Sequence, residues 1–217
     1  MRESILRTRH SVRSFQDKPV DEALIREIIA DAQLAPSWCN SQPAKAYVVT
    51  GELAKKLVKD HHEKNVTKAR SWGEIMPPQP DTWNPNNLAN IDKFLTDGDT
   101  NEGLGDKFGI IKLNGCNFQA PVIIYITVPK NSTMYQGYDA GAFGYGICLS
   151  AHEHGLGTIP AYEFVRFPEE IREIFDIPEN ESILMGIGMG YPDDAEVNDF
   201  YKINGRVPTD SILTIRS

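Results

Sequence analysis

Residues 121–128 (PVIIYITV) constrain the fold of this 217-residue chain more than any other stretch. Successive side chains of a β-strand point to opposite faces of a sheet, and in this run the side chains of both faces are mostly apolar. A strand with that pattern is buried on both faces. The sequence therefore predicts that residues 121–128 form a strand in the interior of the protein, buried on both faces.

Helical spacing of apolar residues predicts the helices of the chain. Asp21 is a good N-cap for a helix whose apolar positions run from Leu24 to Ala32, and Pro36 limits its end. A helix expected over residues 138–154 is apolar nearly all round and rich in Gly and Ala, so it should be central and buried. Further helices are expected over residues 2–9 (with Ile5 and Leu6 inward), over 52–64 and from residue 167 onward. Further strands are expected over residues 46–50, 158–160, 182–189 and 212–215.

Residues 71–105 differ in character from the rest of the chain. Between residues 76 and 85 prolines, which lack an amide donor, are too dense for regular structure. Long irregular segments in compact domains are usually functional lids or disordered chain. Trp72 and Trp83 favour an ordered lid, because disordered segments are depleted in aromatic residues. We interpret the whole chain as a single domain with a substrate lid within residues 70–115.

Composition is that of a globular protein of one domain, or at most two small ones. The apolar fraction of 41% and the charged fraction of 24% are ordinary for such proteins. The net charge of −8 argues against nucleic-acid binding, which requires a basic face. No apolar run reaches the roughly 20 residues that span a bilayer, and the first residues lack the apolar core of a secretory signal. We therefore expect a cytoplasmic protein that binds neither nucleic acid nor membrane.

The cysteines and histidines predict no metal site. The three cysteines are far apart and form no Cys-x-x-Cys pair, so reduced thiols are expected, with neither a zinc knuckle nor a thioredoxin-type site. His152 and His154 are spaced i, i+2, which points them to different faces of a helix. Structural roles are expected for these two and for the adjacent pair His61 and His62.

A basic cluster, residues 9–15 (RHSVRSF), is the first candidate binding site. The guanidiniums of Arg9 and Arg13 are suited to fork a phosphate with planar donors, and the Ser11 hydroxyl adds another short hydrogen bond. The alternative is a solvated basic loop at a helix end, because short basic motifs occur often by chance. A second polar stretch, residues 35–43 (APSWCNSQP), strengthens the functional interpretation, although alone it also fits a simple loop with an Asx turn.

A Gly-x-x-Gly-x-Gly run at residues 141–146 lies inside the expected central helix. A dinucleotide-binding fingerprint requires such glycines at a strand-to-helix turn. Close packing of the helix against its neighbours is therefore the expected role of these glycines.

Five short motifs resemble the FMN-dependent nitroreductase family. They are Arg9-His10-Ser11-x-Arg13, residues 35–43, residues 155–158 (GLGT), residues 188–192 (GMGYP) and residues 206–208 (RVP). Each motif is weak alone, but together they follow the order and spacing of the family and leave mainly residues 61–118 unmatched. The resemblance implies an α+β fold with a central mixed or antiparallel sheet. It also implies an intertwined homodimer with an exchanged C-terminal segment and two FMN sites at the interface.

The resemblance further implies the FMN-binding residues. Arg9 and Ser11 contact the phosphate, and Arg206 closes it from the far end of the chain. His10 and Arg13 lie along the ribityl chain and the pyrimidine edge, where the cation of Arg13 favours two-electron reduction. The residues that reach the flavin of the partner subunit are Pro36, Ser37, Asn40 and Gln42. The segment beneath the flavin is Pro160, Ala161, Tyr162 and Glu163, with a backbone N–H of Tyr162 or Glu163 directed to flavin N5.

The implied activity is a ping-pong oxidoreductase. NADH or NADPH gives a hydride to FMN, and a nitroaromatic, quinone or similar small-molecule electron acceptor then takes two electrons. No catalytic side chain is implied, because the cofactor carries the chemistry. The alternatives are a same-fold flavoenzyme of other chemistry (an activated-alkene reductase, a dehalogenase or a flavin-fragmenting enzyme) and a flavin-binding or redox-sensing protein without turnover.

Overall fold

The computed structural model of the protein describes residues 4–98 and 108–217. The strands are β1 (Lys45–Thr50), β2 (Val122–Pro129), β3 (Gly157–Ala161) and β4 (Glu181–Gly190). The α-helices are α1 (Ile5–Thr8), α2 (Glu22–Ala32), α3 (Gly51–Val66), α4 (Pro85–Gly98), α5 (Ile110–Asn114), α6 (Met134–Glu153) and α7 (Pro168–Phe175). Short 3-10 segments are η1 (Trp38–Asn40), η2 (Pro80–Thr82), η3 (Asn117–Gln119), η4 (Tyr162–Val165), η5 (Glu196–Lys202) and η6 (Thr209–Ser211). None of the described helices is both long and apolar enough to cross a membrane.

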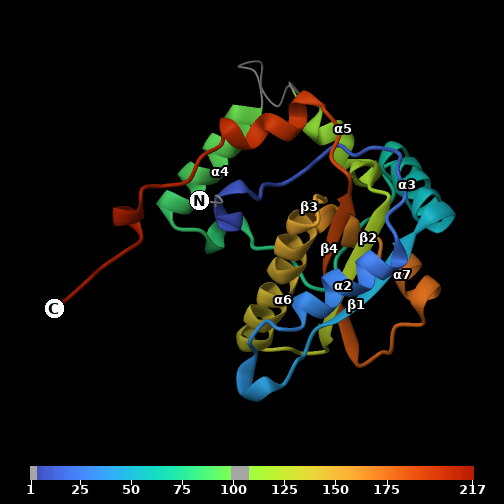
Figure 1. Cartoon of the computed structure of the whole chain (residues 1–217), viewed down its shortest axis with the longest axis horizontal. Coiled ribbons are helices and arrows are strands. Elements are labelled where there is room, and N and C mark those ends of the chain that lie inside the picture. The colour runs from blue at the N-terminus through green and yellow to red at the C-terminus, as the bar shows by residue number, and fades with distance from the viewer. Residues whose placement is uncertain (1–3, 99–107) are drawn as a thin grey trace.

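The four strands form one antiparallel sheet in the order β1-β2-β4-β3 (Figure 1). Strands β2 and β4 occupy its centre, and β1 and β3 are its edges. Every residue of β2 except Pro129 is buried, so the prediction of a strand buried on both faces is confirmed. The antiparallel arrangement also agrees with the expected fold class.

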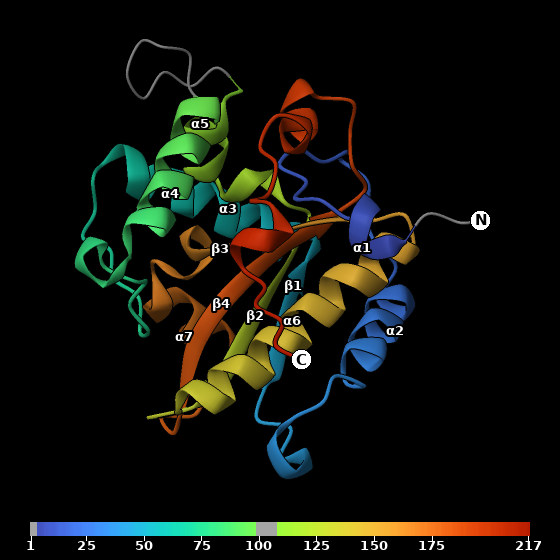
Figure 2. The same cartoon turned by 90° about the vertical axis from the view of Figure 1, so that its left-hand side faces the viewer.

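Helices cover both faces of the sheet (Figure 2). On one face Ile124 and Ile126 of β2 pack in a core with α2 and α6. On the other face Ile123 and Tyr125 of the same strand pack in a core with α3 and α7. The two-residue period of the strand thus distributes its side chains between two apolar cores.

The central helix α6 begins four residues earlier than the sequence predicted. A capping box at its start explains the difference. The Thr133 side chain accepts from the backbone N–H of Gln136, and the Gln136 side chain accepts from the backbone N–H of Thr133. The glycine prediction is confirmed at two of three positions. A Cβ on Gly144 would lie 3.0 Å from Ile126, and a Cβ on Gly146 would lie 3.1 Å from the Cα of Ala32. The third glycine of the run faces open space.

Helix α4 occupies part of the segment that was expected to be irregular, and this prediction is wrong there. The Asn84 side chain accepts a hydrogen bond of 3.0 Å from the Asn87 N–H, and a proline follows Asn84 at the first helical position. Leu88, Ile91 and Leu95 then recur at helical spacing. The short helix α5 was also not predicted. Residues 71–84 keep the expected irregular character, apart from η2.

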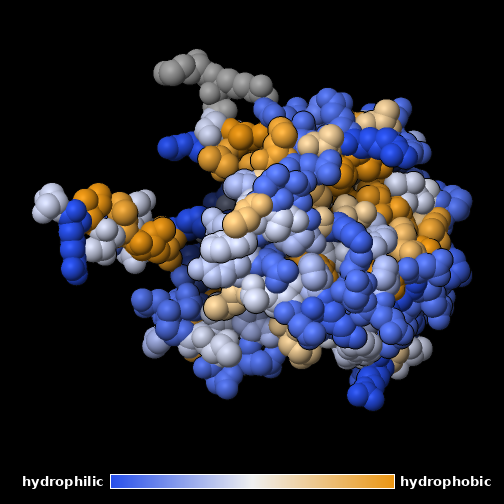
Figure 3. All heavy atoms as spheres, turned by 90° about the horizontal axis from the view of Figure 1, so that it is seen from below, coloured by the Kyte–Doolittle hydropathy of each residue, from blue (hydrophilic) through white to orange (hydrophobic). Residues whose placement is uncertain are grey.

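The C-terminal tail corrects another prediction, because residues 212–215 form no strand within the described chain. Ile212, Leu213 and Ile215 are 78%, 51% and 79% exposed, and the tail projects from the body with its apolar side chains uncovered (Figure 3). A strand requires a neighbour for its backbone hydrogen bonds, and none is offered to the tail within one chain. Leu6, expected to face inward, is likewise exposed on α1.

Candidate functional site

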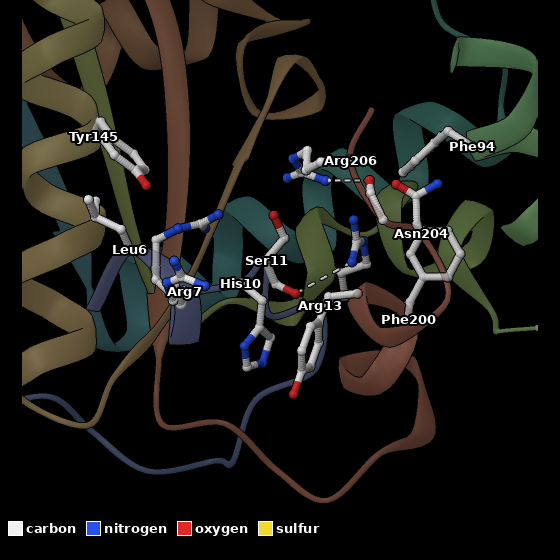
Figure 4. Close-up of a pocket in the computed structure, with 13 residues that line it drawn as sticks. Leu6, Arg7, His10, Ser11, Arg13, Phe94, Tyr145, Phe200, Asn204 and Arg206 are labelled. Atoms are coloured by element: carbon white, nitrogen blue, oxygen red, sulfur yellow. Dashed lines mark hydrogen bonds between the residues drawn. The ribbon is translucent and has the colours of Figure 1, made fainter. Parts of the chain in front are cut away.

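One cavity of about 460 Å³ joins the basic segment to the C-terminal part of the chain. Five residues predicted from the sequence line it: Arg9, His10, Ser11, Arg13 and Arg206. The side chains of Arg206, Ser11 and Arg13 group in the middle of the cavity, between Tyr145 of α6 and Phe94 of α4 (Figure 4). The volume is in the range of cavities that hold a small molecule.

The basic segment is held between the sheet edge and η5. Ser11 forms a bridge with Thr158 of β3, and the Val12 N–H donates to the carbonyl of Thr158 at 2.9 Å. The Asn198 side-chain oxygen of η5 accepts from the backbone N–H of Arg13 at 2.7 Å and from the next N–H at 3.1 Å. These bonds fix the backbone from which the cationic side chains enter the cavity.

The cavity is cationic although the chain is acidic. Arg7 adds a further guanidinium to its lining, and none of the described residues that line it carries a carboxylate. Arg13 is 8% exposed, and desolvation by burial lowers its pKa. The Nε of Arg9 is buried and has no hydrogen-bond acceptor among the described residues. A buried guanidinium donor without an acceptor is unfavourable. These residues therefore fit a ligand that brings hydrogen-bond acceptors, as FMN does with its anionic phosphate and the carbonyl oxygens of its ring.

The polar loop of residues 35–43 does not join this cavity. The Ser37 hydroxyl accepts from the Gln42 N–H at 3.0 Å, and the Gln42 amide donates to the Asn40 side chain at 3.2 Å, so the loop is braced internally. Pro36 and Ser37 line two other hollows near the start of α6.

The loop of residues 35–43 and the basic segment are held apart by the length of α6, which contacts both. Its Asp139 carboxylate accepts from the Trp38 N–H of the loop at 3.0 Å. Its His152 lies 2.9 Å from the Thr8 hydroxyl beside the basic segment. Thirteen residues separate Asp139 from His152, which corresponds to about 20 Å along the helix. The loop and the basic segment thus lie near opposite ends of α6 in one chain.

The segment expected beneath the flavin continues β3 into η4. Pro160 is exposed, Ala161 and Tyr162 are half-buried and Glu163 is buried. None of them lines the cavity, although β3 itself carries the basic segment. Gly73 passes directly over the Tyr162 ring, since a Cβ there would lie 2.7 Å from it.

Glu163 is the centre of a buried polar network. Its Oε1 lies 2.7 Å from His61 Nε2 and accepts from Arg166 at 2.7 Å and from Asn65 at 3.0 Å. Its Oε2 accepts from Asn114 at 2.9 Å. The structural role expected for His61 is confirmed. The sequence contains no local signal for this network, because three of the partners lie 49, 98 and 102 residues away.

Comparison with known proteins decides the family. A model described as the nitroreductase family matches residues 6–191. The chain belongs to the nitroreductase family.

Named nitroreductases are similar in sequence to this protein over most of its length. A 4-nitrobenzoate reductase of Nocardioides sp. (strain LMS-CY) is 33% identical, over 88% of this chain and 80% of that protein. A 4-nitrobenzoate reductase of Pseudomonas putida is 29% identical, over 90% of this chain and 88% of that protein. The crystal structure of the FMN and NADPH-dependent nitroreductase NfnB from Sphigopyxis sp. strain HMH is 27% identical, with a TM-score of 0.82 over 98% of this chain and 97% of that one.

The Glu163 network makes the stability of this nitroreductase pH-dependent. Burial raises the pKa of Glu163, but hydrogen bonds from His61, Arg166 and Asn65 outweigh it and hold the pKa below its ordinary value of 4.5. A carboxyl with a depressed pKa stabilises the fold above its unfolded pKa and loses that contribution as pH falls. We expect the difference in melting temperature between wild type and Glu163→Gln to shrink from pH 6 to pH 3, mainly below about pH 4.5. A difference that stays constant over this range would contradict the ionised network.

Proposed function

We propose that the protein is an FMN-dependent oxidoreductase that uses NADH or NADPH to reduce nitroaromatic, quinone or similar acceptors in two-electron, ping-pong turnover. The observation that carries the proposal is the cationic cavity, in which Arg9, Ser11, Arg13 and Arg206 meet and whose described lining residues include no carboxylate. Membership of the nitroreductase family supports it. Nitrobenzoates are the first acceptors to test, because two relatives are named for that substrate.

Each cavity residue has a proposed task toward the cofactor. Arg9 and Ser11 bind the phosphate, and Arg206 closes it from the C-terminal side. The orphaned Nε of Arg9 supports this, since a phosphate oxygen would supply its missing acceptor. His10 follows the ribityl chain, and Arg13 lies at the pyrimidine edge. Bound FMN supplies the redox chemistry, taking electrons from the nicotinamide and passing them to the acceptor.

Two further segments complete the proposed site. Residues 160–163 pass beneath the cofactor, and the backbone N–H of Tyr162 or Glu163 serves as donor to it. The close packing of Gly73 on Tyr162 and the anchored Glu163 side chain support a rigid backbone here. Helix α4 forms part of a substrate lid within residues 70–115. Its Phe94 lines the cavity.

We further propose a homodimer in which Pro36, Ser37, Asn40 and Gln42 reach the FMN of the partner subunit. The distance of this loop from the cavity of its own chain supports the arrangement. The partner's residues 212–215 would pair with β1. The edge of β3 is covered by Ser11, whereas β1 leaves an open edge beside a groove of about 570 Å³ against α2. The exposed apolar side chains of the tail would be buried there.

The function is tested on the purified protein. We expect a visible flavin spectrum, loss of that absorbance on anaerobic addition of NADH or NADPH, and steady-state reduction of 4-nitrobenzoate or a quinone. Bound FMN without turnover would instead indicate a flavin-binding or redox-sensing protein. A colourless protein that does not take up added FMN would contradict both functions.

The dimer is tested by sedimentation. We expect a dimer at micromolar concentration and a weakened or monomeric species when residues 209–217 are removed. A wild-type monomer at that concentration would contradict the shared site, because the loop of residues 35–43 would then have no flavin to reach.

A further inference from the structure

Phe200 of η5 occupies a junction between the basic segment and helix α4. The ring is 1% exposed and lines the cavity. The Arg13 guanidinium carbon lies 5.1 Å from its centroid. On other sides the ring meets Phe94 of α4 at 5.4 Å, edge to face, and Phe108 at 5.5 Å. One buried ring therefore touches both a cavity cation and the helix over the cavity.

The Arg13 side chain depends strongly on this ring. Among the described residues its guanidinium makes one long hydrogen bond, 3.4 Å to the Ser11 carbonyl, and pairs with no carboxylate. An arginine side chain has many rotamers, so holding it in one direction requires a partner. An aromatic face provides such a partner through the cation–π interaction, which is stronger when the cation is desolvated.

Other contacts of η5 act on the same segment. Asn198 accepts from the Arg13 backbone N–H, and Tyr201 stacks on His10 with ring centroids 3.9 Å apart. Phe200 lies between these two residues and acts on the Arg13 side chain. The backbone anchor and the side-chain anchor of Arg13 therefore come from one short helical segment.

Helix α4 approaches η5 from the opposite side. Besides the contact of Phe94 with Phe200, the Asp97 carboxylate accepts from the Asn204 amide at 3.3 Å. A shift of α4 would therefore displace the ring that orients Arg13.

We propose that Phe200 is a positioning residue that orients the Arg13 guanidinium toward the cofactor and couples that orientation to helix α4. This inference rests on the proposed FMN site. It means that a ligand which shifts α4 changes cofactor affinity, and that the cofactor changes affinity for that ligand by the same factor.

The test measures FMN binding to the apoprotein by flavin fluorescence and the midpoint potential of the bound flavin. Phe200→Leu is expected to raise the Kd for FMN about 5- to 30-fold. It should also lower the midpoint potential, because a displaced cation stabilises the reduced, more negative flavin less. Phe200→Tyr retains the ring, so its FMN Kd and midpoint potential should stay near those of wild type. Phe118→Leu, at another buried ring that is 3% exposed, should lower stability while leaving both values near wild type.

A double-mutant cycle separates positioning from general destabilisation. In an Arg13→Gln background, Phe200→Leu should cause no further change in the FMN Kd or the potential. If the changes in FMN Kd and potential caused by Arg13→Gln and Phe200→Leu add in full, the positioning role of Phe200 is overturned, while the proposed function stands. Phe94→Ala removes a ring that is 36% exposed and should weaken FMN binding about twofold to fivefold through Phe200. No effect would overturn the coupling to α4. Failure of wild type to bind FMN would overturn the proposed function itself, and this inference with it.

Discussion

Replacing Glu163 with alanine is expected to lower the free energy of unfolding by about 3–5 kcal/mol. Glu163 is 6% exposed and receives hydrogen bonds from α3, from α5 and from Arg166, the residue that follows η4. Alanine would leave the Arg166 guanidinium and the buried His61 without their common acceptor. Breaking a buried ion pair by removing one partner is strongly destabilising, because the remaining charge keeps its desolvation penalty.

Urea denaturation of three variants measures this effect. Glu163→Gln retains the shape and one acceptor oxygen, so a smaller loss of about 1–2 kcal/mol is expected. Glu63→Ala is the matched control on α3, since its carboxylate is 64% exposed and lies 3.8 Å from Lys59. A surface pair of this kind contributes less than about 1 kcal/mol. Equal losses for Glu163→Ala and Glu63→Ala would show that the network does not stabilise the fold.

Replacing Arg206 with alanine is expected to weaken FMN binding about 10- to 100-fold. Among the described residues its guanidinium makes one hydrogen bond, of 3.1 Å to the carbonyl of Gly205, so that further donors can meet a phosphate in the cavity. Arg206→Lys keeps the charge but loses the planar fork, so an intermediate loss of about 3- to 10-fold is expected. Titration of apoprotein with FMN measures both variants.

The control for Arg206 is Lys202→Ala on the same C-terminal segment. Lys202 carries the same charge, pairs with Asp199 at 2.7 Å and does not line the cavity. Its removal should change the FMN Kd by about twofold or less. Similar losses for Arg206→Ala and Lys202→Ala would mean that FMN senses only the general charge of this segment, and would remove Arg206 from the phosphate site.

Elements with a strong local pattern were predictable. Residues 121–128 are apolar on both strand faces, and β2 is buried on both faces. The Asp21 carboxylate accepts from the Ala23 N–H at 2.7 Å and begins α2 where expected. Pro168 stands at the start of α7. In each case a few neighbouring residues carry the information, as capping and periodicity require.

The missed elements depend on context. Helix α4 was obscured by the prolines around it, although Asn84 and the following proline are a good helix start. The apolar tail at residues 212–215 has strand character but no neighbouring strand in one chain. Strand formation is a property of a pair, so sequence pattern alone does not decide it.

The sequence by itself determined the family and the residue types of the cationic site, because short motifs in a set order carry both. It did not determine that Phe94, Tyr145 and Phe200 line the cavity, that the loop of residues 35–43 lies near the far end of α6, or that Glu163 gathers four partners. Those facts were decided by the tertiary structure. Propensity and periodicity act over a few residues, whereas a cavity or a buried network joins groups far apart in the chain, and their meeting depends on how the helices pack on the sheet.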